Sequence, residues 1–441
     1  MSLRSFVAGI GATAILALSA LPAQAGFFDP DPGFGGGDGV VKVSDYCSAA
    51  LVEAAGDRIY VAGYCQGGGS GEYYSWIKVL DASGAPLAER EFRAWCWGFW
   101  PGLTELVALP DGDILVGGFA DSSSIPGRVW LGRFTDQLEP VKSWGLMEQT
   151  CDGTYSAPGF RALDDVDFTG LGGVLLDTHQ RIIVVGQLGG DVGAVRLGLD
   201  GTVDAAFGNE GVARMRTPGV GDYVRDAALT EDGAILAAGE MVRSPYGDIA
   251  SYVAAFTPGG AADTSWSSDG LRVLPSGWRN GFDQAQRVQA LPTGEVIVGL
   301  VDAAQGSRAE RVGVTRLQSD GSTDASFAGE GTTTTKCRGS RWADSFDDLL
   351  VVPRTSGGYR VQIAIECRVD REWTPEVAAW LEDGTPAPSL GADGIAVVPW
   401  GRGILDMALA SDGATLGVTS HPKVSGHAAL VKLGPWPYPT S

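Results

Sequence analysis

The chain is poor in histidine and in cationic side chains. Only three of its 441 residues are histidine, and 32 Lys and Arg residues face 53 Asp and Glu residues, a formal net charge of −21 at pH 7. This negative charge repels phosphate backbones and anionic lipids, so we expect neither nucleic-acid binding nor membrane binding. His179, His421 and His427 fall in predicted turns and loops. Solvated loop histidines are therefore expected, rather than a catalytic triad or a three-histidine metal site.

Long apolar runs are missing after the first 25 residues. No later stretch approaches the ~18 uninterrupted apolar residues of a spanning helix, so we expect no membrane insertion of the mature chain. Residues 1–25 combine Arg4, a mostly apolar segment over 6–21 and Ala23-Gln24-Ala25, which is the pattern of a cleaved signal peptide. A membrane anchor is the alternative. We expect residues 26–441 to be exported, to the periplasm or outside the cell.

Helical periodicity is also absent from the mature chain. Short apolar runs are broken by Asp, Ser, Pro and many of the 65 glycines, which is typical of an all-β protein with many turns. One phrase recurs four times, with Gly, an apolar side chain six residues later and a second Gly four beyond. The repeated apolar residues are Phe207, Trp266, Phe327 and Leu390, at spacings of 59, 61 and 63 residues. Such units bury their apolar faces against one another.

Each unit also contains a hairpin, in which alternating apolar residues flank a turn with Gly or Asp. Examples are VALPDGDILVGG (107–118) and AALTEDGAILAAG (227–239), and seven such segments follow one another. A third and a fourth strand complete each unit. Because four antiparallel strands in about 60 residues make one propeller blade, the sequence predicts a single all-β domain over 26–441, a seven-bladed β-propeller.

The two ends of the mature chain are predicted to share a blade. The last unit, Ile404 to Leu433, has only three strands, whereas residues 29–43 (DPDPGFGGGDGVVKV) match the phrase that precedes a fourth strand. Phe34 stands where Phe207 does, and Asp31 where Asp204 does. We expect this N-terminal strand to close the ring, which removes exposed sheet edges, and we expect a monomer.

These phrases resemble the bacterial delta-60 repeat family. The matching residues are DGAILAAG at 232–239 and VDAAFG at 203–208, and the likeness covers about two-thirds of the mature chain. The resemblance implies an exported β-propeller. It implies no catalytic residues, because the family motif is a folding motif.

Six cysteines in an exported chain favour disulfides over free thiols or a metal site, since no CxxC or Cys/His cluster occurs. Cys47 and Cys65 lie symmetrically about Gly56, the expected turn of one hairpin, so they should face each other across it. The other predicted pairs are Cys337 with Cys367 and Cys96 with Cys151.

Two further groups are candidate binding residues. Asp164, Asp165 and Asp167 could hold calcium, although they lack DxDxDG spacing and a charged turn explains them equally; no other cofactor is predicted. Trp97 and Trp100 lie in the aromatic stretch RAWCWGFWPG, where exposed rings could bind a glycan or a protein partner. Packing between the first two blades is the alternative. A third group, Asp204, Asp263 and Asp324, is expected to cap its own turns.

The sequence therefore favours a non-enzymatic, exported scaffold that binds an unidentified protein or glycan. No catalytic residue is assigned. One alternative is a polysaccharide-acting enzyme with a carboxylate pair near the propeller axis. A second alternative is an adhesin module of the cell envelope, which would expose an apolar patch.

Overall fold

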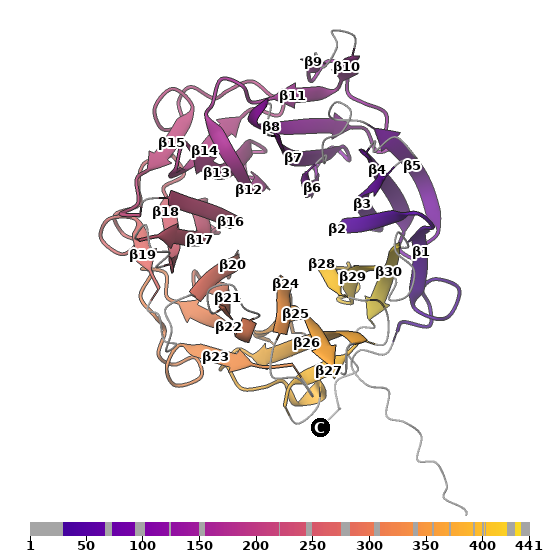
Figure 1. Cartoon of the computed structure of the whole chain (residues 1–441), viewed down its shortest axis with the longest axis vertical. Coiled ribbons are helices and arrows are strands. Elements are labelled where there is room, and N and C mark those ends of the chain that lie inside the picture. The colour runs from indigo at the N-terminus through magenta and orange to yellow at the C-terminus, as the bar shows by residue number, and fades with distance from the viewer. Residues whose placement is uncertain are drawn as a thin grey trace, which may run out of the picture.

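The protein is a seven-bladed β-propeller, seen here in a computed structural model in which four-stranded antiparallel sheets surround a central axis (Figure 1). The structure describes residues 30–66, 73–92, 102–122, 125–149, 155–219, 221–243, 249–274, 283–303, 309–337, 343–354, 357–369, 372–390, 393–398, 401, 403–420 and 428–433. Its strands follow the predicted units. Blades are numbered below in chain order, and each is given from its innermost to its outermost strand.

The first four blades occupy the half of the ring that begins at the N-terminal end. Blade 1 contains β2 (Cys47–Ala55), β3 (Arg58–Gln66), β4 (Tyr73–Asp81) and β5 (Pro86–Phe92). Blade 2 contains β6 (Leu103–Ala108), β7 (Ile114–Ser122), β8 (Ile125–Phe134) and β11 (Phe160–Ala162). Blade 3 contains β12 (Phe168–Leu176), β13 (Ile182–Leu188), β14 (Asp191–Leu197) and β15 (Val212–Met215). Blade 4 contains β16 (Gly221–Leu229), β17 (Ile235–Val242), β18 (Ile249–Phe256) and β19 (Leu271–Val273).

The remaining three blades complete the ring. Blade 5 contains β20 (Asp283–Ala290), β21 (Val296–Ala303), β22 (Ala309–Leu317) and β23 (Thr332–Thr335). Blade 6 contains β24 (Ala343–Pro353), β25 (Tyr359–Val369), β26 (Glu372–Leu381) and β27 (Ile395–Val397), with the 3-10 turn η1 (Pro388–Leu390) before β27. Blade 7 contains β28 (Ile404–Leu409), β29 (Thr415–Ser420), β30 (Ala428–Leu433) and β1 (Val40–Ser44).

Two features depart from a plain ring of seven sheets. A short hairpin of β9 (Leu146–Gln149) and β10 (Tyr155–Pro158) leaves blade 2 at its outer side (Figure 1). A single bridge between Ala309 and Ala343 joins the sheets of blades 5 and 6. Neither changes the order of strands within a blade.

The core lies between the blades, because both faces of each sheet are buried. In β13, Ile182 and Val184 pack against blade 2, whereas Ile183 and Val185 pack against blade 4. Alternating side chains of one strand thus enter two different apolar layers. Seven such layers occur, one at each junction between neighbouring blades, including the junction of blades 7 and 1. The described strands therefore form one continuous domain.

The N-terminal strand belongs to the last blade. The segment predicted to provide an outer strand is β1, which pairs antiparallel with β30 from Val40 opposite Val431 to Ser44 opposite Ala428. Pro30 forms a further bridge with Leu433. Strands from opposite ends of the sequence thus lie side by side (Figure 1).

The repeated phrase fastens each blade to the next one. Phe207, Trp266, Phe327 and Leu390 are buried, as predicted. The backbone after the ring also bonds to the next blade, since the Gly208 N–H donates to Gly259 O at 2.8 Å and the Ala328 N–H to Asp383 O at 2.8 Å.

A glycine in the turn of the next blade receives each ring. Gly260, with φ 86°, lies so close to Phe207 that a Cβ there would come within 2.9 Å of the ring, and Gly321 stands in the same relation to Trp266. The positive φ and the close approach together explain why these turns contain Gly.

Blade 2 contains a version of this contact that the sequence pattern missed. Trp144 is buried, donates through Nε1 to Leu199 O at 2.7 Å and packs on Gly201 of blade 3. The preceding turn carries Leu138 at a φ of 61°, where the other repeats have Gly. Because the glycine of the motif is missing, the phrase is hard to recognise there.

Cationic side chains on the third strands strengthen the same junctions. Arg196 stacks over Phe207 at 4.7 Å and donates to Pro258 O at 2.6 Å. Arg316 repeats this with Phe327 and Glu382 O. The predicted turn caps are present, since the Asp204 carboxylate accepts the Ala206 N–H at 3.1 Å, and it also pairs with Arg196 at 2.9 Å.

Two of the predicted disulfides are present. Cys47 and Cys65 are opposite one another in β2 and β3 and are bonded, and Cys337 is bonded to Cys367. Cys96 and Cys151 lie outside the described residues.

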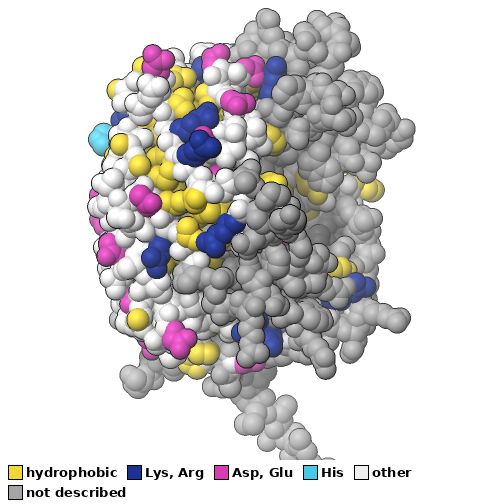
Figure 2. All heavy atoms as spheres, turned by 60° about the vertical axis from the view of Figure 1, so that its left-hand side comes forward, with side chains coloured by type: hydrophobic (Ala, Val, Ile, Leu, Met, Phe, Trp, Pro, Cys, Tyr) yellow, Lys and Arg dark blue, Asp and Glu magenta, His cyan; other side chains and the backbone are white. Residues whose placement is uncertain are grey.

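The outer face around β15, β18 and β19 carries interspersed basic and acidic side chains (Figure 2). None of the helices among the described residues has the length and apolar character needed to cross a membrane.

The repeated ring should be essential for stability. We expect Phe327→Ala to lower the free energy of unfolding by about 3–5 kcal/mol, because it empties a fully buried aromatic site between blades 5 and 6. Urea denaturation measures the change, with Leu87→Ala on the exposed side of β5 as control. Equal stability of the two variants would contradict this role.

Candidate functional site

The innermost strand of every blade contains a β-bulge near its middle. The pairing register shifts, for example, between Ala49 and Leu51 in β2 and between Val224 and Asp226 in β16, and the same shift occurs in all seven blades. A bulge bends the strand and redirects its side chains. The residues directly after the bulge are Leu51, Glu105, Gly173, Asp226, Arg287, Asp348 and Asp406.

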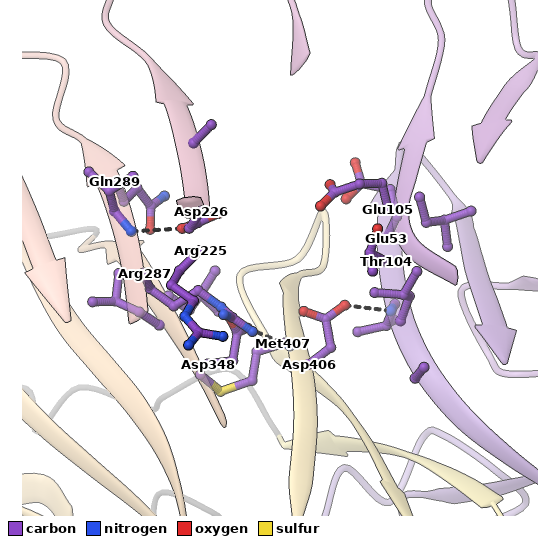
Figure 3. Close-up of a pocket in the computed structure, with 18 of the residues that line it drawn as sticks. Glu53, Thr104, Glu105, Arg225, Asp226, Arg287, Gln289, Asp348, Asp406 and Met407 are labelled. Carbon is purple, nitrogen blue, oxygen red and sulfur yellow. Dashed lines mark hydrogen bonds and ion pairs between the residues drawn. The ribbon is translucent and has the colours of Figure 1, made fainter. Parts of the chain in front are cut away.

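These strands surround an axial cavity of about 500 Å³. Five carboxylates line it, together with the guanidinium groups of Arg225 and Arg287. Figure 3 shows Glu53 and Glu105 on one wall and Arg225, Arg287 and Asp226 on the opposite wall. The described residues that line the cavity include no aromatic side chain.

Most of these carboxylates hold neighbouring blades together. Asp226 of blade 4 accepts the Val288 N–H of blade 5 at 2.7 Å. Asp406 of blade 7 accepts the Val52 N–H of blade 1 at the same distance, as Figure 3 shows. Each bond provides a partner for a backbone group on a strand that has a ladder partner on one side only.

Asp348 connects three blades. Its Oδ2 accepts the Met407 N–H of blade 7 at 2.8 Å, and its Oδ1 accepts from Arg287 Nε of blade 5 at 2.9 Å. Arg287 Nη2 also donates to Asp347 O at 2.7 Å. The guanidinium therefore offsets part of the negative charge on this side of the axis.

Glu105 has the same role between blades 2 and 3, where its carboxyl accepts a backbone hydrogen bond from Val174. Blade 3 provides no carboxylate at the equivalent position, because Gly173 stands there. A Cβ on Gly173 would come within 2.8 Å of the Ala227 Cβ, so the glycine permits blades 3 and 4 to approach closely.

Glu53 is the lining carboxylate that joins no blades. It stands two residues after Leu51, as Gln289 stands two residues after Arg287. Gln289 accepts the Val351 N–H of blade 6 at 2.8 Å. Among the described residues, Glu53 has neither a hydrogen-bond partner nor an ion-pair partner.

Burial in the cavity wall favours the protonated forms of these acids. It raises the pKa of Glu53 to about 7. Burial and the nearby charge of Asp226 raise the pKa of Glu105 to about 8. Burial also raises the pKa of Asp226 to about 7, and burial together with the charge of Asp348 raises that of Asp406. The empty cavity therefore holds more protons near neutral pH than five free carboxylates would.

Arg225 differs from Arg287 because its charge is matched outside the cavity. Its Nη2 contacts Glu240 Oε1 at 2.5 Å, and its guanidinium lies 5.5 Å from the ring of Tyr223. Glu240 is only 3% exposed, and its second oxygen has no hydrogen-bond partner. Arg225 thus adds little positive charge to the cavity itself.

The structure does not gather the predicted calcium ligands. Asp164, Asp165 and Asp167 are exposed, and Asp164 pairs with Arg128 at 3.1 Å. Within the described ranges, one group of three potential ligands has its atoms within 4.8 Å of one another, and it contains the disulfide-bonded Cys337 and Cys367 with Glu376.

The other predicted residues do not enter the axial site. Trp97 and Trp100 lie outside the described residues, as do His421 and His427. His179 is exposed at the turn between β12 and β13, as expected.

The axial residues themselves were not predicted as a site. One signal could have indicated them: Asp226, Arg287, Asp348 and Asp406 each interrupt an apolar run at the same place in successive repeats.

Comparisons with known proteins agree on the fold alone. No family model matches the chain, and no curated protein does. Among solved structures, Drosophila Plexin A in complex with Semaphorin 1b aligns at 10% identity and a TM-score of 0.47, covering 90% of this chain and 86% of that one. The β-propeller domain of the Trilobed protease from Pyrococcus furiosus aligns at 8% identity and a TM-score of 0.43, covering 90% and 98%. An α-L-arabinofuranosidase from Fusarium graminearum aligns at 11% identity and a TM-score of 0.44, covering 81% and 97%.

The raised pKa of Glu105 should make stability fall as pH rises. Folded protein keeps this proton up to about pH 8, whereas the unfolded chain loses it near the ordinary pKa of 4.5, so folding is progressively disfavoured between those values. We expect Glu105→Gln to gain stability relative to wild type, on the order of 2 kcal/mol, between pH 5 and pH 8. Urea denaturation at both pH values measures this.

The exposed Glu91→Gln in β5 removes the same charge from the surface and serves as control. If the curves of Glu105→Gln and wild type run parallel from pH 5 to pH 8, Glu105 titrates normally and the interpretation is wrong.

Proposed function

We propose that the protein is an exported binding scaffold whose ligand occupies the axial cavity. One observation carries this proposal: charged side chains from six blades converge on a cavity of about 500 Å³. Its size lies in the range of small-molecule sites, and charged groups give such sites their specificity. Glu53 further supports it, because no contact between blades uses its carboxylate.

Export is supported by two independent features. Residues 1–25 have the pattern of a signal peptide, and two disulfides staple blade 1 and the junction of blades 5 and 6. Disulfides persist in oxidising compartments such as the periplasm or the extracellular space. The resemblance to delta-60 repeat proteins agrees with this location.

Blocking the cavity tests the proposal. Glycan arrays and defined small-molecule panels first identify ligands of the mature chain. Thr104→Trp then places a large ring at the exposed edge of the cavity, and we expect at least a tenfold loss of affinity. Thr178→Trp, at the exposed turn of blade 3, introduces the same ring far from the axis and should leave affinity unchanged.

Equal affinity of the two tryptophan variants and wild type would move the binding site elsewhere. Trp97→Ala and Trp100→Ala then test the aromatic stretch that the sequence first suggested. A loss of binding in these variants alone would overturn the axial proposal.

A second candidate is hydrolysis of a glycosidic bond. It is favoured by one observation, namely that Glu105, with a pKa of about 8, shares a deep cavity with the arginine-bound Asp348. Such enzymes need one carboxyl that stays protonated and one carboxylate that stays ionised.

A panel of chromogenic glycosides tests this candidate. We expect mature protein to hydrolyse at least one of them, and Glu105→Gln to lose at least 100-fold in rate while Glu91→Gln retains it. Absence of hydrolysis across the panel, or equal rates for the two variants, would reject the enzyme.

A further inference from the structure

We infer that the ligand of the axial cavity is a linear organic cation with at least two ammonium groups, held chiefly by Glu53 and Glu105. This inference rests on the proposed function, since it names the ligand class of the same cavity. It follows from the charges of the wall, from the contacts that those charges already make and from their spacing.

The wall carries a surplus of negative charge. Five carboxylates line the cavity, and the guanidinium of Arg287 is the cation that pairs with one of them, Asp348. The other lining cation, Arg225, is paired with Glu240, which does not line the cavity. Buried carboxylates without a counter-charge are costly, so the cavity favours a ligand that brings positive charge.

Structural roles account for the carboxylates unevenly. Asp226, Asp348 and Asp406 accept backbone N–H groups of neighbouring blades at 2.7–2.8 Å. Glu53 makes no such bond, although Gln289 at the equivalent place does. An ionisable side chain that lines a cavity and joins no blades is therefore available for a ligand.

The spacing of these groups favours an extended cation over a metal ion. In the part of the chain that the structure describes, the axial carboxylates do not form a group of three ligand atoms within 4.8 Å. They are spread around the wall instead, with Glu53 and Glu105 on one side and Asp226 on the other (Figure 3). Two ammonium groups on a flexible chain can reach both walls, and each has three hydrogen-bond donors.

Calorimetric titration of the mature protein with spermidine tests the inference. We expect one site per chain at pH 7 and no heat from 1,5-pentanediol, which is linear but neutral. Glu53→Gln should weaken binding at least tenfold. Glu91→Gln removes the same charge from the exposed surface of blade 1 and should leave the affinity within twofold of wild type.

Proton release gives a readout that a purely structural role would not move. Because part of the wall is protonated in the empty cavity, bound ammonium groups should displace protons. The observed heat should therefore depend on the ionisation enthalpy of the buffer, and this dependence should shrink in Glu53→Gln.

Three results would overturn the inference. They are no binding of spermidine at millimolar concentration, equal weakening by Glu53→Gln and Glu91→Gln, and binding of 1,5-pentanediol as tight as that of spermidine. Equal weakening would indicate general attraction to a chain of net charge −21. If another ligand still lost affinity in Thr104→Trp, the proposed function would stand while its cationic ligand class would fall.

Discussion

Each blade of this propeller depends on its two neighbours, because its sheet buries both faces and has no core of its own. Alternate residues of β13, such as Ile183 and Val184, enter different apolar layers. The seven layers share their sheets, so the loss of one junction exposes apolar surface on two blades at once. The repeated aromatic turns at the outer strands and the carboxylate bonds at the inner strands both act at these junctions.

The outer junctions could be predicted from the sequence because their chemistry is local. Phe207, its flanking glycines and Asp204 lie within one short phrase, and the same phrase recurs about 60 residues later. Cys47 and Cys65 could be paired for a similar reason, since one hairpin turn relates them. Trp144 escaped notice because Leu138 replaces the glycine that makes the other turns recognisable.

The axial site could not be predicted in the same way. Glu53, Glu105, Asp226 and Asp406 come from four different blades, and only the closed ring brings them around one cavity. Their direction also depends on a β-bulge in each inner strand, and a bulge of this kind leaves no distinctive residue in these sequences. In a single strand, a carboxylate within an apolar run gives no indication of whether it faces a neighbouring blade or the axis.

The same constraint explains why the cavity is acidic. An innermost strand has a ladder partner on one side only, so some of its N–H groups need acceptors from elsewhere. A carboxylate from the preceding blade can provide one, as Asp406 does for Val52 and Asp226 for Val288. Repetition of this solution around the ring concentrates negative charge at the axis. That charge can be offset by protons, by a cationic side chain such as Arg287, or by a bound cation, so the contacts that close the ring also determine the chemistry of its cavity.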